Sequence, residues 1–168
     1  MSDDKQTFII HRTFRAPREL IFTCLSEAKH LQHWWGPKGV TIVKPSVDFR
    51  VGGTFHYGMR GLNDQITYGR QVYREIVSPT KITLVNSFSD EKAGLARAPF
   101  ADKWPIELLT VFSFDEVAEG FTRFTVIWSP WNADEEERRV FASYHASMNG
   151  GWSGTFEQLD AYLETLKA

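Results

Sequence analysis

The chain has 168 residues, of which 42% are hydrophobic and 24% are charged, a composition typical of a globular protein with a real core. Its net charge of −2, without a dense cluster of Lys and Arg, argues against nucleic-acid binding. No stretch approaches the ~20 consecutive apolar residues of a membrane span.

The N-terminal part predicts one strand and two short helices. Residues 7–14 (TFIIHRTF) are rich in β-branched and aromatic side chains, as strands are. The stretch APRELIFTCL predicts an amphipathic helix with Pro17 at its first position, where the missing N–H costs nothing. The stretch SEAKHLQHWW predicts a second helix with Ser26 as N-cap, ended by Gly36 and Pro37.

The middle of the chain shows the period of two that indicates strands. Apolar residues alternate from Val40 to Val51, and again from Phe55 to Met59, on either side of a VGGT turn. Further strands are predicted over 66–77, 82–88, 106–115 and 121–130, separated in part by the turn signals SPTK and EVAEG. The segment 89–104 has no period and is predicted to be a surface loop.

The last third predicts a single long helix. Its apolar stripe, with steps of three or four, consists of Phe141, Tyr144, Met148, Trp152, Phe156, Leu159, Leu163 and Leu166. Asn132 and Glu135 resemble a capping box at the start of an acidic first turn. The stripe is interrupted by Gly150, Gly151 and Gly154. These glycines could bend the helix or let another group approach its backbone.

This order of elements predicts an α+β helix-grip fold. A curved antiparallel sheet of six to seven strands would wrap around the long C-terminal helix, in a single domain over 1–168 with an ordered core over 7–167. A sheet of that width curls, and the terminal helix is the only element long enough to cover its concave face. The space between the sheet and the helix is then the natural ligand site.

Four stretches carry a family likeness: RTFRAPRELIFTCLSEAKHLQHWWGP, VDFRVGGTFHY, VYREIVSPTKI and MNGGWSGTFEQLDAYLETL. In this order they resemble the START-like or SRPBCC superfamily (birch-pollen-allergen-like), in the branch of the heat-shock-protein-ninety ATPase activator homologues. The resemblance implies the helix-grip fold and a deep cavity under the long helix, but no shared catalytic set. Members of the superfamily range from lipid and polyketide binders to cyclases and chaperone cofactors.

The aromatic share of 14% suits a cavity lined with rings. We expect the cavity wall among Trp34, Trp35, Phe55, Tyr57, Tyr68, Phe112, Trp128, Met148, Trp152 and Phe156. For the two adjacent tryptophans a plain core position is the main alternative, and the two readings are compatible because a cavity wall is also core.

Four polar strand residues are candidates for the same cavity: His56, Arg70, Glu107 and Arg123. Alternation alone does not show which face of the sheet is concave, and a charged strand residue is more often solvated. If they point inward, they could orient the polar end of a ligand or act as acid–base groups.

Other reactive residues offer little. His30 and His33 could share a helix face with Glu27, but a zinc site normally needs a further ligand, and both histidines suit a solvated last turn. Cys24 is expected to be an inert buried thiol, and Ser153 lies in the closing helix. No catalytic residue, metal or cofactor is assigned.

The sequence therefore favours a binding domain for a small hydrophobic molecule such as a lipid, polyketide or aromatic compound. A cyclase or hydrolase acting in the same cavity is one alternative. A chaperone-activator-like stress-response module is another, although the activators of that family carry an additional N-terminal domain for which we expect no room. A protein partner or a homodimer is also compatible. One cysteine and no signal-peptide pattern fit a cytoplasmic location.

Overall fold

The computed structural model describes residues 6–167, so residues 1–5 and 168 of the predicted domain lie outside the described residues. Strand β1 (Phe8–Phe14) is followed by helices α1 (Arg18–Ser26) and α2 (Ala28–Trp34). The elements that follow are β2 (Thr41–Val47), β3 (Thr54–Arg60), β4 (Ile66–Val77), β5 (Lys81–Ser89), β6 (Glu107–Ala118), β7 (Phe121–Trp131), α3 (Glu135–Ser143) and α4 (His145–Thr165).

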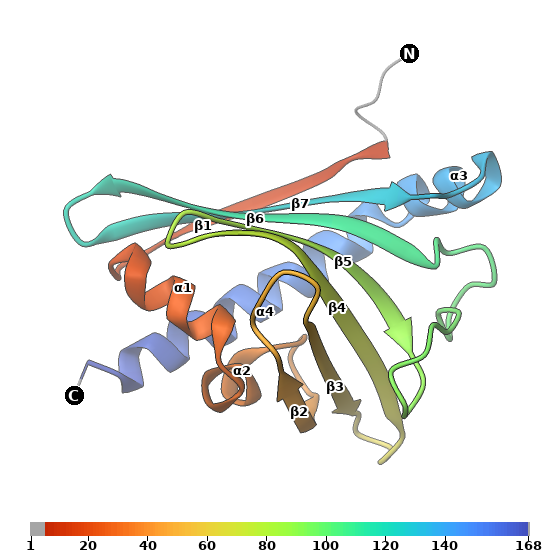
Figure 1. The fold of residues 1–168 in the computed structure, drawn as a ribbon, viewed down its shortest axis with the longest axis horizontal. Helices are drawn as coiled ribbons and strands as arrows, with labels where there is room; N and C mark the ends of the chain where they lie inside the picture. The colour runs from red at the N-terminus through yellow and green to blue at the C-terminus, as the bar shows by residue number, and fades with distance from the viewer. Residues whose placement is uncertain (1–5, 168) are drawn as a thin grey trace.

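The strands form one sheet of seven, in the order β1-β7-β6-β5-β4-β3-β2, and all neighbours are antiparallel. The sheet is curved and does not close, so β1 and β2 are its two edges (Figure 1). Helix α4 runs across the concave side, α2 packs beside it, and α1 packs on α2 and β6. The predicted helix-grip fold is confirmed.

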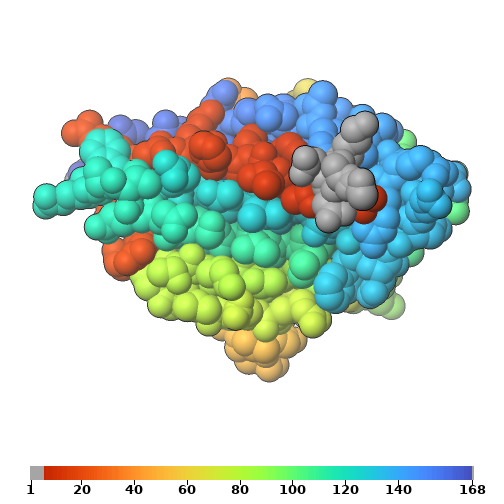
Figure 2. Space-filling view, turned by 90° about the horizontal axis from the view of Figure 1, so that it is seen from above, coloured from red at the N-terminus to blue at the C-terminus, as the bar shows by residue number. Residues whose placement is uncertain are grey.

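Alternation along each strand decides which side chains face α4. On β4, Gly69, Gln71 and Tyr73 are buried, whereas Arg70 and Val72 between them are more exposed. We call the side that carries the first three the inner face, and the opposite side the outer face. Figure 2 looks onto the outer face, where β1, β7, β6 and β5 lie side by side at the molecular surface.

Phenylalanine rings fill one part of the space between the inner face and α4. The ring centroid of Phe124 lies 5.4 Å from that of Phe156 and 5.5 Å from that of Phe112. Phe14 on β1 meets Phe156 edge-on at 5.7 Å, the arrangement that aromatic quadrupoles favour. All four side chains are buried. This part of the interior is solid, and open space under α4 lies elsewhere.

The predicted single C-terminal helix is wrong, because the chain forms two helices that meet at Tyr144. That residue has φ −102° and ψ 9°, between the helical and extended regions. Its ring packs at 5.6 Å from Trp104 and 5.3 Å from Phe100, two residues of the loop before β6. Tertiary packing thus sets the break. The three glycines proposed as bend points lie inside an unbroken α4.

The capping box of α3 lies two residues later than predicted. Asp134 is the N-cap, and its side chain accepts a hydrogen bond from the Glu137 N–H at 2.8 Å. In return, the Glu137 side chain accepts one from the Asp134 N–H at 2.9 Å. Asn132, the predicted cap, has φ +53° and belongs to the turn before the helix.

Two other predicted helix starts are shifted. Pro17 is the N-cap of α1 and not its first helical residue. Ser26 does not cap α2, because it is the last residue of α1 and its hydroxyl donates to the Thr23 carbonyl at 3.1 Å. Glu27, in an extended conformation, precedes α2 without a side-chain cap.

Candidate functional site

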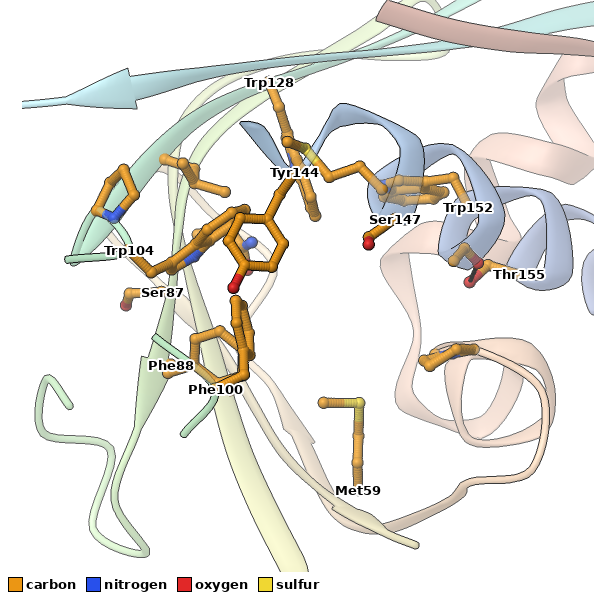
Figure 3. Close-up of a pocket in the computed structure, with 18 of the residues that line it drawn as sticks. Met59, Ser87, Phe88, Phe100, Trp104, Trp128, Tyr144, Ser147, Trp152 and Thr155 are labelled. Carbon is orange, nitrogen blue, oxygen red and sulfur yellow. Dashed lines mark hydrogen bonds between the residues drawn. The ribbon is translucent and has the colours of Figure 1, made fainter. Parts of the chain in front are cut away.

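A cavity of about 440 Å³ lies between the inner face of the sheet and α4, beside the end of α2 (Figure 3). Parts of the chain that are distant in sequence converge on it. Its lining consists of Trp35, Gly36, Pro37, Tyr57, Met59, Gly69, Asn86, Ser87, Phe88, Phe100, Trp104, Pro105, Ile106, Leu108, Trp128, Tyr144, Ser147, Met148, Gly151, Trp152 and Thr155.

The corner after α2 forms one wall of the cavity. Gly36 turns the chain there with φ +94°, a conformation that favours glycine. Gln158 of α4 holds this corner, since its Nε2 donates to the Gly36 carbonyl at 2.6 Å and to the Trp34 carbonyl at 3.3 Å. Trp35 is thereby fixed against Trp152, with ring centroids 5.6 Å apart.

Tyr57 and Gly69 build the floor together, as direct cross-strand partners on β3 and β4. A methyl group placed on Gly69 would lie only 2.5 Å from the Tyr57 hydroxyl oxygen. Glycine is therefore needed for the Tyr57 ring to lie across β4. Phe88, the partner of Gly69 on β5, continues the floor.

Helix α4 forms the roof with alternating large and small residues. Met148 and Trp152 are buried, whereas Ser147, Gly151 and Thr155 follow one another at steps of four, on one side of the helix. Figure 3 shows Ser147 and Thr155 on the side that faces the open space. A Cβ atom added at Gly151 would meet no atom within 4 Å. The space between α4 and the cavity is therefore open at Gly151.

The loop before β6 supplies an aromatic rim. Phe100 is 50% exposed and lies 5.2 Å from Trp104, which is buried. Arg97 fastens this loop to α3, because its Nη1 donates to the Glu137 carboxylate at 2.8 Å and to the Trp104 carbonyl at 3.3 Å. Phe100 and Tyr144 thus border the mouth, and the ion pair holds the loop that carries the rim.

The lining carries no Asp, Glu, Lys, Arg or His side chain. Burial raises the pKa of Tyr57 to about 12, an effect that the neighbouring Trp35 indole opposes only in part. Tyr57 consequently remains protonated at neutral pH. Asn86 contributes a carboxamide, and Ser147 and Thr155 contribute hydroxyls. The cavity can therefore offer hydrogen bonds but no formal charge.

The structure brings several of the sequence candidates to this lining: Trp35, Tyr57, Trp128, Met148 and Trp152. They come from the corner after α2 and from β3, β7 and α4, so no contiguous stretch of sequence encodes the site.

The other aromatic candidates lie away from the lining, so their placement there is corrected. Trp34 is buried in the core and donates from Nε1 to the Cys24 carbonyl at 3.1 Å. Other rings pack behind lining residues, namely Phe55 and Phe112 behind Trp35 and Phe156 behind Trp152. Tyr68 lies on the outer face and stacks on His56 at 5.6 Å.

All four polar candidates lie on the outer face and not in the cavity. His56 Nε2 lies 3.1 Å from a carbonyl of the 90–93 loop, and Arg70 Nη1 donates to another at 2.7 Å. Glu107 and Arg123 each precede an inward-facing residue of their strand, so they point outward. Strand alternation correctly divides the residues of each strand between two faces, but it does not show which face lines the cavity.

Sequence reasoning missed part of the lining. Phe100 and Trp104 lie in the segment without a period, where periodicity has nothing to detect. Asn86 was detectable, because it interrupts the inward series Ile82, Leu84, Asn86, Phe88 with a polar residue. Such an interruption on a buried face is a signal for a site.

Of the histidine pair of α2, His33 is exposed to solvent as predicted, whereas His30 is only partly exposed and joins α2 to α4. His30 Nδ1 lies 2.6 Å from the Tyr162 hydroxyl of α4, and His33 stacks on the same ring at 5.2 Å. Cys24 is buried, and its burial raises the pKa of the thiol to about 12. Within residues 6–167, no group of three or more His, Cys, Asp or Glu side chains is placed to hold a metal. No helix in that range is long and apolar enough to cross a membrane.

A family model described as "Activator of Hsp90 ATPase homolog 1-like protein" matches residues 15–164. No curated protein gives a match. Solved structures are similar over nearly the whole chain. Protein Ms6760 from Mycobacterium smegmatis is 25% identical with a TM-score of 0.75, covering 96% of this chain and 93% of that one.

Two further structures show the same fold at lower identity. A protein from Arthrobacter aurescens is 24% identical with a TM-score of 0.79, covering 98% of this chain and 90% of its own. The AHSA1 protein from Silicibacter pomeroyi is 19% identical with a TM-score of 0.70, covering 96% and 99%.

Proposed function

Because this chain belongs to the family of activator of Hsp90 ATPase homolog 1-like proteins, we propose that its function is carried by the cavity under α4, which binds an uncharged hydrophobic molecule with rings. The single observation that supports this most is the lining itself, which combines aromatic walls with an absence of charged side chains. The volume of about 440 Å³ lies in the range of small-molecule sites.

The walls favour rings over flexible chains. Trp35 meets Tyr57, Phe112 and Trp152 edge-on, with ring centroids 5.6 to 6.2 Å apart. These contacts hold the Trp35 ring in place from several sides. Rigid walls of this kind lose little conformational entropy when a flat ligand enters. Burial of each apolar group contributes about 1.5–3 kcal/mol, so a few groups suffice for micromolar affinity.

We propose binding without catalysis. The polar residues on which a cyclase or hydrolase would depend, among them His56 and Arg70, lie on the outer face. General acid–base catalysis needs a titratable group within reach of the substrate, near its working pKa. Tyr57, with its raised pKa, is a hydrogen-bond donor in this site and a poor base.

Two matched dyes test the proposal. N-phenyl-1-naphthylamine is neutral, and 1-anilinonaphthalene-8-sulfonate adds a sulfonate to the same ring system. We expect the neutral dye to bind with enhanced fluorescence, and the anionic dye to bind at least tenfold more weakly, since no cation in the lining compensates for its desolvation. Equal binding of both dyes, or none of the neutral dye, would count against the proposed site.

The family description supports a second candidate, an activator-like module that binds a chaperone ATPase. Its support is the match over residues 15–164. An ATPase assay with purified Hsp90 of the same cell distinguishes the two functions. If this chain stimulates the ATPase activity, and still does so when a bulky residue fills the cavity, the activator role is favoured. If the ATPase activity is not stimulated, ligand binding is the remaining candidate function.

A further inference from the structure

Two carboxamide side chains lie next to each other on the inner face, where most of the other buried side chains are apolar. Gln71 of β4 and Asn86 of β5 are direct register partners in the antiparallel ladder. Direct partners have Cβ atoms about 4.5–5.5 Å apart and point to the same side. Asn86 lines the cavity, and Gln71, only 4% exposed, lies beside it.

Neither amide has a partner among residues 6–167. The side-chain hydrogen bonds of these strands involve Arg70, Thr83 with Glu75, and Ser89. The amide atoms of Gln71 and Asn86 are not among the fully buried polar atoms that lack a partner, so they remain accessible to solvent or to a ligand in the cavity. Their register neighbours Phe55 and Leu108 are apolar and buried, so packing alone would favour an apolar residue at both positions.

We propose that Asn86 is the polar anchor of the cavity, and that it selects uncharged ligands that carry a carbonyl group on a ring. This inference rests on the proposed function. The Asn86 amide donates a hydrogen bond to the carbonyl oxygen and can also accept one from an adjacent N–H or O–H. Gln71, its partner across the ladder, is a positioning residue that limits the directions in which the Asn86 amide points.

The neighbourhood of Asn86 supports a neutral acceptor. Tyr57 lies across Gly69, the residue two positions before Gln71 on β4. The Tyr57 hydroxyl is protonated at neutral pH, since burial raises its pKa further above the ordinary value, and it is therefore a second donor on the same floor. Without a cation in the lining, a carboxylate has no counter-charge there. A ketone, lactam or quinone oxygen can use these donors without bringing a charge into the cavity.

The test uses 1-tetralone and tetralin, which share a bicyclic frame and differ in the carbonyl. Their binding is measured by displacement of N-phenyl-1-naphthylamine from the unsubstituted 168-residue chain. We expect 1-tetralone to bind about threefold to tenfold more tightly than tetralin, the ratio that one net hydrogen bond supplies. The Asn86→Leu variant should lose this preference and retain tetralin binding, while Asn149→Leu, on the exposed side of α4, should keep the preference.

The outcomes separate the anchor from the cavity. If Asn86→Leu still binds tetralin and still prefers 1-tetralone to the same extent, Asn86 is not the polar anchor. The proposed function of the cavity then still stands. Failure of every probe to bind the natural chain overturns both. An Asn86→Leu variant that melts at lower temperature and loses tetralin as well would make Asn86 a structural residue, which also overturns the anchor. Asn86→Ser, which shortens the side chain without adding bulk, repeats the comparison if the first variant does not fold.

Discussion

Gly150 and Gly151 are adjacent on α4, and a Cβ atom added at either would meet no atom within 4 Å, yet only Gly151 lines the cavity. Gly150 faces solvent. The pair therefore offers a matched test of the cavity, since we expect the fold to tolerate the same substitution at both positions and the new side chain to fill the cavity at only one.

We expect Gly151→Leu to reduce binding of N-phenyl-1-naphthylamine at least tenfold, and Gly150→Leu to leave it unchanged. Both variants should melt at or above the temperature of the natural chain, because a glycine inside a helix costs about 0.5–1 kcal/mol relative to residues with side chains. Dye titration and thermal unfolding check these expectations. Equal binding by the two variants would place the dye elsewhere.

The two tryptophans of the HLQHWWGP stretch should separate stability from binding. Trp34→Phe removes the buried hydrogen bond to the Cys24 carbonyl and leaves unfilled volume in the core. We expect it to lower the free energy of unfolding by about 1–3 kcal/mol with little change in dye affinity. Trp35→Phe alters the cavity wall and should change dye affinity several-fold. Urea unfolding and dye titration on both variants measure the contrast, and a reversed pattern would contradict the assigned positions.

The capping box at the start of α3 gives a third prediction. Asp134→Ala removes the acceptor for the Glu137 N–H and should cost about 0.5–2 kcal/mol of stability. Asp134→Asn keeps an acceptor at the same place and should cost only a fraction of that. Chemical denaturation of the two variants decides the matter, and equal losses would mean that the negative charge, and not the cap, stabilises the helix.

Two partly buried histidines should make stability depend on pH. Burial lowers the pKa of His30 and of His145 below the usual 6.5, although Glu27 opposes the shift at His30. As the pH falls below about 6.5, the unfolded chain takes up these protons before the folded protein does, so folding loses stability. We therefore expect a lower melting temperature at pH 5.5 than at pH 7.5.

The variant pair His30→Gln with His145→Gln should flatten this dependence, and His11→Gln, on an exposed position of β1, should not. The carboxylates whose pKa is lowered, such as Asp90 and Glu157, titrate below this window and do not confuse the comparison. An unchanged slope in the double variant would assign the pH dependence to other groups.

Period-two alternation located β4 from Ile66 to Val77, because such a pattern needs only local burial on one face. It failed to say which face was inner, and for that reason His56 and Arg70 remained candidates for the cavity although a solvated position is more common for such residues. The break at Tyr144 was invisible in the sequence. It depends on rings from the loop before β6, which are about 40 residues away along the chain.

The cavity itself is an intermediate case. An aromatic stripe on α4 and an aromatic-rich sheet indicated where a ligand site should lie, and Trp35 and Trp152 were expected on its wall. A cavity, however, is left wherever facing side chains do not fill the space between them, and this depends on exact packing. Composition and periodicity carry no information on it. Ring-lined solid core and ring-lined cavity have the same sequence pattern, as Phe156 and Trp152 illustrate.

The most direct test of the account is a crystal structure of the protein grown with 1-tetralone. We predict electron density for its rings between Trp35 and Trp152, under α4, with the carbonyl oxygen within hydrogen-bonding distance of the Asn86 amide. Density for the ligand on the outer face, or a cavity closed by its own side chains while 1-tetralone binds elsewhere, would contradict the proposed site and the function assigned to it.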